Sequence, residues 1–319
     1  MFHLLYETPN STNRKRKAED LMKAIPPKRL HFRGPNDQQN WLLPDSIIYY
    51  ITKTPSNAKA WEELIQSCKY FFAKNPIIVA DILNFSQGWE VFTNTSAGRL
   101  QKRIPPKNVS YKLWITETLR IYGANRKYVS SIISQIYRCD ATELHLNGQI
   151  LSFKEFLFFS RNVEVLRLGF TGTHDNKNYT VVKNEDGTIV PLEQLVKTLT
   201  KLKQIKGTNN PTHSFVTKNT ARELLKIPHF FQIQKFLFTG LPEVFDVDAI
   251  FAYLKKNKHM KFELHFADSI SQTFKTRLEK IVDEIIETET HDYKPPLISF
   301  DGLAEEKKRK ISCLYYSRS

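Results

Sequence analysis

The chain has 319 residues, of which 41% are hydrophobic, 12% aromatic and 25% charged. This composition excludes collagen-like, disordered and disulfide-rich classes, and the length predicts about two domains. The three cysteines, Cys68, Cys139 and Cys313, lie too far apart for a CxxC metal or redox motif and suit a reducing compartment. Because no apolar stretch reaches 18 residues, we expect an intracellular protein of the nucleus or cytoplasm, with no membrane partner.

The net charge of +14 is concentrated toward the N-terminus, since residues 1 to 35 carry eight basic and three acidic side chains. Residues 1 to 38 have no sustained apolar period and contain several prolines, so we predict a disordered basic tail. Two clusters in this tail resemble a bipartite nuclear-import signal, although a solubilising tail has the same composition. The clusters are Arg14, Lys15, Arg16 and Lys17, followed by Lys28 and Arg29.

Residues 39–83 differ from the tail in carrying three short, very apolar segments. The first begins at Pro44, which suits the first turn of a helix because its missing N–H would be unpaired there anyway. Ile47, Ile48 and Ile51 then share one helical face. The sequence therefore predicts a helix that starts at about Pro44.

A second helix is predicted over 58–72, and the third apolar segment runs over 76–83. A module of about 43 residues without metal or disulfide rarely stabilises itself. It must bury an apolar face against another protein or, equally well, against the rest of its own chain. The apolar positions of the second helix are Trp61, Leu64, Ile65, Cys68, Phe71 and Phe72.

These residues resemble an F-box, a three-helix module that docks on the Skp-type adaptor of cullin-RING ubiquitin ligases. The resemblance spans about 40 residues and rests on Leu43-Pro44, the isoleucine stripe, Leu64 and the stretch 67–72. The whole chain, including residues 61–65, also resembles a roundworm-expanded family of F-box-like proteins with a leucine-rich-repeat-like C-terminal region. That second resemblance covers about 280 residues.

The resemblance implies a substrate-recognition adaptor that binds a Skp-type adaptor directly, a cullin indirectly, and a protein substrate that the sequence does not identify. The adaptor-binding residues it implies are Leu43, Pro44, Ile47, Ile48, Ile51, Trp61, Leu64, Ile65, Cys68, Phe71 and Phe72.

Residues 84–110 form a basic, proline-bearing stretch that we interpret as a connector. Beyond it, residues 114–122 and 128–137 are predicted to be two helices separated by Gly123, the second with Ile132, Ile133 and Ile136 on one face.

Strand-like alternation then recurs at 143–146, 165–168, 203–205, 235–238 and 261–266, with helical stretches between. The markers Leu144, Leu166, Ile205, Phe236 and Leu264 are separated by 22, 39, 31 and 28 residues, similar to irregular leucine-rich repeats. Residues 111–319 are therefore predicted to form an irregular leucine-rich-repeat-like solenoid, with an ordinary α/β domain as the alternative. The fold class expected is α+β or α/β, a three-helix F-box-like module followed by this solenoid.

Alternate strand residues of such a solenoid face away from its helices and form either a polar recognition face or a merely solvated one. The residues at these positions are Glu143, His145, Arg167, Lys235, Lys261, Glu263 and His265.

The C-terminal part contains the clearest helical pattern in the chain, over 269–289, which Asp268 or Ser269 can cap. A last strand is predicted over 297–300, and residues 305–310 are predicted to form a solvated helix face.

No catalytic constellation is present. The histidines form no HxxxH pair, and no phosphate-binding loop, dinucleotide motif or nucleophile elbow occurs, so we expect neither an enzyme nor a cofactor or metal. The absence of helix-turn-helix, zinc-finger and basic-aromatic patterns does not favour nucleic acid as a partner. The alternative kept is a nuclear structural or nucleic-acid-associated protein that uses its basic tail, with the apolar helices only capping the solenoid.

Overall fold

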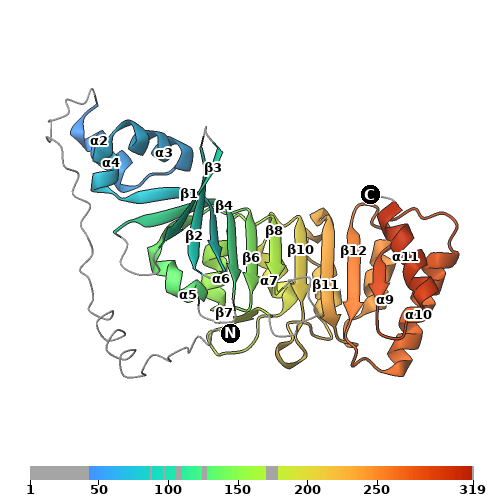
Figure 1. Ribbon diagram of the computed structural model, residues 1–319. Coiled ribbons are helices and arrows are strands. Elements are labelled where there is room, and N and C mark those ends of the chain that lie inside the picture. Colours follow the sequence, from blue (N-terminus) through green and yellow to red (C-terminus); the bar gives the residue numbers. More distant parts are fainter. Residues whose placement is uncertain are drawn as a thin grey trace, which may run out of the picture.

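The computed structural model describes residues 43–86, 88–95, 98–104, 110–123, 128–169 and 179–317. Within these ranges the chain has a mixed α/β fold built on one large, mostly parallel sheet (Figure 1). The α-helices are α2 (Asp45–Lys53), α3 (Ala58–Ser67), α4 (Lys69–Lys74), α5 (Tyr128–Ile132), α6 (Phe153–Ser160), α7 (Leu192–Thr198), α8 (Thr220–Leu225), α9 (Val247–Leu254), α10 (Gln272–Glu287) and α11 (Glu305–Ser317). The strands are β1 (Ile77–Phe85), β2 (Trp89–Thr95), β3 (Gly98–Ile104), β4 (Lys112–Tyr122), β5 (Ile136–Cys139), β6 (Glu143–Asn147), β7 (Ile150–Ser152), β8 (Val165–Leu168), β9 (Val181–Lys183), β10 (Gln204–Thr208), β11 (Lys235–Leu241), β12 (Lys261–Phe266) and β13 (Leu297–Ser299).

The main sheet has the strand order β13-β12-β11-β10-β8-β6-β4-β1-β2-β3, with β5 paired to β4. Strands from β13 to β1 are parallel, whereas β1, β2 and β3 form an antiparallel end. Parallel neighbours need a crossover connection, and helices supply most of these along the sheet. Beyond the β1 end, the parallel strands follow one another in chain order, so the sheet grows in a single direction (Figure 1).

One row of apolar side chains crosses the sheet in register. The pairs Leu119 with Leu144, Leu144 with Leu166, and Leu166 with Ile205 are direct neighbours. Phe236 and Phe262 continue the row, and all six side chains are completely buried. Successive side chains of a strand point to opposite faces of the sheet. Every second residue of these strands is apolar, and these apolar residues form the row on the face that the helices cover.

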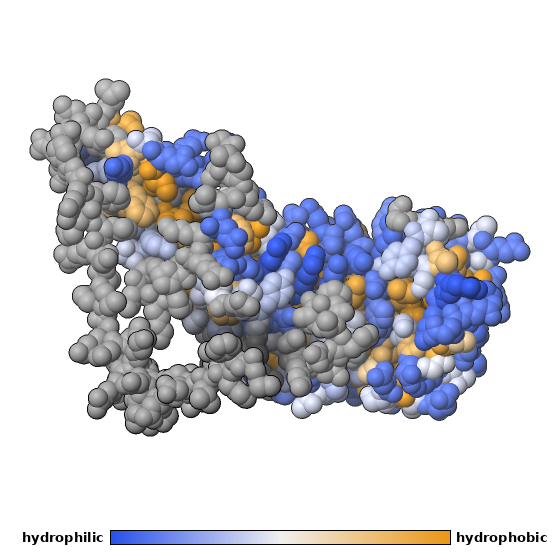
Figure 2. All heavy atoms as spheres, viewed as in Figure 1, coloured by the Kyte–Doolittle hydropathy of each residue, from blue (hydrophilic) through white to orange (hydrophobic). Residues whose placement is uncertain are grey.

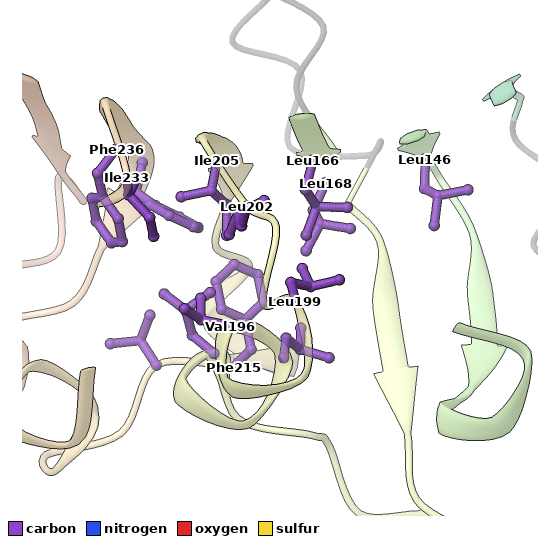
Figure 3. Close-up of a cluster of buried hydrophobic side chains, with 14 of the residues drawn as sticks. Leu146, Leu166, Leu168, Val196, Leu199, Leu202, Ile205, Phe215, Ile233 and Phe236 are labelled. Atoms are coloured by element: carbon purple, nitrogen blue, oxygen red, sulfur yellow. The ribbon is translucent and has the colours of Figure 1, made fainter. Parts of the chain in front are cut away.

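Helix α7 shows how this face is covered. Figure 3 shows Leu166, Leu168 and Ile205 pointing from their strands toward Val196 and Leu199, which are themselves buried. At about 25 cal/mol per Å² of apolar surface removed from water, this layer is the main source of stability of the sheet.

The predicted strands at 143–146, 165–168, 203–205, 235–238, 261–266 and 297–300 are confirmed to within three residues as β6, β8, β10, β11, β12 and β13. The residue of β12 that is in register with Phe236 is Phe262, so the last repeat step measures 26 residues rather than the 28 counted to Leu264.

The predicted helix over 114–122 is wrong, because these residues belong to strand β4. β4 lies between β1 and β6 and is apolar on both faces at its start, where Leu113, Trp114 and Ile115 are all buried. A strand buried on both faces lacks the period-two signal, so its apolar run is easily mistaken for a helix. The predicted helix over 128–137 is confirmed only for α5, since a 3-10 turn and strand β5 follow it.

The third apolar segment of the predicted helical module is strand β1, and helices α2, α3 and α4 all precede it. The predicted helix over 58–72 is divided at Cys68, whose backbone is extended. The predicted connector 84–110 instead contains the end of β1 and the antiparallel strands β2 and β3. The helical module and the sheet are therefore joined without the expected linker.

Helix α10 confirms the helix expected over 269–289, but its cap is Ser271, whose hydroxyl accepts a hydrogen bond from the backbone of Phe274. Helix α11 contains the expected solvated stretch 305–310, except that Lys307 pairs with Glu279 and Asp283 of α10. In the described part of the chain, no helix has the length and apolar character that crossing a bilayer requires.

Replacing Phe236 with alanine should lower the free energy of unfolding by about 3–5 kcal/mol, because its ring is completely buried in the in-register row. The matched control is Phe231→Ala, where 62% of the side chain is exposed and the change should stay within about 0.5 kcal/mol. Urea unfolding followed by circular dichroism measures both, and equal effects of the two variants would contradict this packing.

Candidate interaction surfaces

The N-terminal helices are held to the sheet by a separate apolar cluster. Ile48 of α2, Trp61 of α3 and Phe71 of α4 pack with Val79 of β1 and Trp114 of β4. The indole N–H of Trp61 donates to the carbonyl oxygen of Ile77 at 3.1 Å, and its ring meets Phe71 edge-on. These contacts fix three short helices that would be too small to fold alone.

The cluster lies on the sheet face opposite to most of the other helices. Val79 and Trp114 belong to it, whereas their chain neighbours Ala80 and Leu113 belong to the main core. Successive side chains of a strand point to opposite faces, so α2, α3 and α4 cover the second face at its β1 end (Figure 1). The rest of that second face is hereafter the open face.

Polar contacts strengthen the same junction. Tyr137 donates from its hydroxyl to the Pro55 carbonyl at 3.2 Å, and the Asn75 amide donates to the Thr52 carbonyl at 2.8 Å. Trp114 donates its indole N–H to Asp140, which also accepts from Arg138. The helices are thus anchored by residues from well beyond them in the chain.

One surface of α2 is left exposed by this packing. Leu43, just before the helix, and Ile47 and Tyr50 within it follow each other at steps of four and three residues, and are 50%, 45% and 73% exposed. Helical residues at this spacing share one face. We call these three residues the apolar stripe. Apolar side chains gather over this part of the molecule in Figure 2.

The predicted adaptor-binding residues therefore divide into two groups. Leu43, Pro44 and Ile47 are exposed, so the expected single face of Ile47, Ile48 and Ile51 is not observed. The others are buried or half-buried, and most pack in the cluster: Ile48, Ile51, Trp61, Leu64, Ile65, Cys68, Phe71 and Phe72. The predicted tail and its nuclear-import residues Arg14, Lys15, Arg16, Lys17, Lys28 and Arg29 lie outside the described residues.

The open face carries a row of basic side chains on four neighbouring strands. Arg120 of β4 is in register with His145 of β6, His145 with Arg167 of β8, and Arg167 with Lys206 of β10. These four residues alternate with the buried apolar row, so they point away from the helices. We call them the basic row, and hydrophilic side chains gather over this part of the sheet in Figure 2.

A carboxylate lies beside the first two residues of the basic row. Glu143 is 3.9 Å from the guanidinium of Arg120 and 3.3 Å from Nε2 of His145. Nδ1 of His145 lies 3.2 Å from the hydroxyl of Tyr122. Burial, together with the charges of Arg167, Arg120 and Lys206, lowers the pKa of His145 to about 3, so its imidazole is neutral at pH 7.

Lys206 is affected by the same crowding. Burial, then the charges of Arg167 and Lys235, lower the pKa of its ammonium group, whereas Glu263 acts in the opposite direction. In the basic row, positively charged side chains are therefore held close to one another.

The far end of the open face is closed by α11. The hydroxyl of Tyr315 donates to Glu263 at 3.2 Å, and Lys235 and Lys261 lie over the Tyr315 ring. Burial would raise the pKa of Glu263, but the hydrogen bond from His265 and the charge of Lys235 bring it below its ordinary value. Charges at this end are thus paired with each other.

The seven residues predicted to alternate outward do so unequally. His145 is almost fully buried among its neighbours, whereas Glu263, Lys235 and His265 form the paired end. Sequence reasoning missed Arg120, because β4 was taken for a helix, and Lys206, because the predicted strand ended one residue before it. Alternation extended over Gln204, Ile205 and Lys206 was the available signal for the second.

The described residues offer no metal-binding group of three His, Cys, Asp or Glu side chains. A cavity of about 840 Å³ beside α6 is lined by apolar residues such as Tyr137, Leu157 and Phe158 and by charged ones, with Cys139 also at its wall. Burial raises the pKa of the Cys139 thiol to about 12, which makes it unsuited to act as a nucleophile.

A scan against protein-family models found no match for the chain, and a search of curated proteins found no significantly similar sequence. The resemblance to F-box-like proteins therefore stays a prediction from the residues.

Stability should depend on His145 in mildly acidic solution. Because its pKa falls from an ordinary 6.5 to about 3 on folding, the unfolded chain takes up a proton first as the pH drops. This contribution to stability is complete above pH 6.5 and is lost progressively toward pH 3. His145→Gln should therefore flatten the decline of the free energy of unfolding between neutral and mildly acidic pH.

Urea titrations at a series of pH values test this expectation. His259→Gln is the matched control, since it makes the same substitution at an exposed position. A slope for His145→Gln equal to that of the unaltered chain would show that His145 is not held neutral by its surroundings.

Proposed function

We propose that this protein is a non-enzymatic substrate-recognition adaptor of a cullin-RING ubiquitin ligase. Helices α2, α3 and α4 act as the F-box-like module that binds a Skp-type adaptor, and the open face of the sheet binds a protein target. The cullin is reached only through the Skp-type adaptor, and catalysis belongs to other subunits.

The observation that carries the proposal is the apolar stripe on a fixed helix. Ile48 holds α2 against Trp61 and Phe71, while Ile47 and Leu43 stay in water. Full burial of one such side chain is worth about 1.5–3 kcal/mol, so this surface gains from being covered by another protein. A helix that merely capped the sheet would have no need of a second apolar surface.

The repetitive arrangement of the sheet supports the second half of the proposal. Successive parallel strands joined by helices on one face are what a leucine-rich-repeat-like solenoid has, and irregular step lengths suit an irregular member. Such folds present an extended open sheet face to protein partners. The open face here is polar and continuous from β4 to β10.

Co-purification with a recombinant Skp-type adaptor, at low and high salt, tests the proposal. The variant Leu43→Asp/Ile47→Asp places two charges on the apolar stripe and should abolish the complex. The matched control Phe231→Asp/Val244→Asp adds the same charges at exposed apolar positions elsewhere and should retain it. Circular dichroism and the thermal midpoint verify that both variants are folded.

A complex that resists salt and is lost only with the stripe variant supports the adaptor function, because apolar contacts are not screened. Absence of a complex with the unaltered chain would refute it. In that case steep salt dependence of nucleic-acid binding would favour the basic-tail alternative.

A further inference from the structure

The basic row has a composition that sheet stability does not explain. Side chains in register on neighbouring strands are within reach of each other, and like charges placed opposite one another are destabilising. Arg167 stands between His145 and Lys206 with no ion pair to any residue that the structure describes. The repulsion between Arg167 and its basic neighbours is therefore not offset by an acidic partner among the described residues.

The hydrogen bonding of the basic row also indicates that a partner is missing. Nε of Arg120 and Nε of Arg167 are both buried, and within the described ranges neither has a hydrogen-bond acceptor. A buried donor without an acceptor costs roughly 1–3 kcal/mol. Guanidinium groups bind carboxylates with two parallel hydrogen bonds, so an anionic group lying on the row would pair with both guanidinium groups and offset the cost of their charge.

The length of the row fits an extended peptide. Four neighbouring strands span about 14 Å from the first to the last, at roughly 4.8 Å per strand. An extended segment rises about 3.3 Å per residue, so three side chains at alternate positions span about 13 Å on one face. Three acidic residues at alternate positions therefore match the row from Arg120 to Lys206.

The undescribed parts of this chain do not supply such a segment. Residues 1–42 hold eight lysines and arginines against four aspartates and glutamates, and residues 170–178 hold a single acidic residue, Asp175. Both segments lack the run of alternating acidic side chains that the row would match. The partner that complements the charge is therefore a different molecule.

We propose that the basic row binds an extended acidic segment of the target protein, whose aspartate or glutamate side chains at alternate positions pair with Arg120, Arg167 and Lys206. The inference rests on the proposed function in that the open face receives a protein. It adds the chemical class of that protein's binding segment.

A peptide suits the row better than a nucleic acid does. The row is short, and carboxylates lie at its two ends, Glu143 beside Arg120 and Glu263 beyond Lys206. A phosphate backbone that continued past either end would meet these negative charges. Nucleic-acid surfaces are instead usually extended stripes of positive charge.

Fluorescence anisotropy of the full chain with a short labelled peptide tests the inference. The probe carries aspartate at alternate positions with serine between, and the control probe carries asparagine in place of aspartate. Arg167→Gln/Lys206→Gln should weaken binding of the aspartate peptide by about tenfold or more. The matched control Arg161→Gln/Lys197→Gln removes the same charges from exposed positions, directly after α6 and on α7, and should change it less than about twofold.

Two further measurements test whether a loss of peptide binding has a cause other than the loss of the two charges. The thermal midpoint of Arg167→Gln/Lys206→Gln should equal or exceed that of the unaltered chain, because the substitution removes repulsion. The charge reversal Arg167→Glu/Lys206→Glu should lose the aspartate peptide and bind a lysine version of it, which a purely structural role would not produce.

The proposal is overturned if both glutamine variants weaken binding equally, or if binding is lost only in a variant of the tail residues Arg14, Lys15, Arg16 and Lys17. It is also overturned if single-stranded DNA of equal charge binds the row more tightly than the peptide. No Skp-type adaptor is present in these measurements, so their failure leaves the adaptor complex to be judged by its own experiment, and the reverse holds equally.

Discussion

The register of one apolar row governs this molecule. Leu144, Leu166 and Ile205 occupy equivalent positions on neighbouring parallel strands, and Phe236 extends the row. Because strand side chains have a period of two, this alignment sends the apolar half of every strand to the helices and the polar half to the opposite face. A slip of one residue in any strand would exchange the two halves. The helix-covered core and the open face are therefore consequences of a single alignment.

The position of the N-terminal helices depends on a second constraint, which follows from the register of the apolar row. The sheet leaves its other face uncovered, and near β1 that face is apolar through Val79 and Trp114. Three helices too short to fold alone are stabilised there, with Trp61 at the centre of the contact. Since α2 uses Ile48 for this attachment, the neighbouring surface with Ile47 stays outside. The surface that attaches α2 to the sheet and the exposed surface with Ile47 are thus neighbouring surfaces of the same short helix.

Charged side chains are arranged in two opposite ways on the open face. At the α11 end, Glu263 is satisfied by Lys235, His265 and the Tyr315 hydroxyl, an arrangement that stabilises the fold locally. In the middle, Arg167 lies among other basic groups and His145 is kept neutral by burial and their charge. Charges that are not paired within a fold are common where a partner completes them.

The sequence by itself determined the elements whose periodicity was unmistakable. These are the amphipathic helix α10 and the strands β8 and β12, in which buried residues alternate with half-buried ones. It did not determine β1 and β4, because their apolar runs are buried on both faces near the N-terminal helices and so lose the alternation that distinguishes a strand. Only the tertiary structure decided that Ile47 is exposed while Ile48 is buried, and that Arg120, His145, Arg167 and Lys206 form one row across four strands. Adjacent members of this row are 22 to 39 residues apart in the chain, and their contact follows from register, which no local pattern encodes.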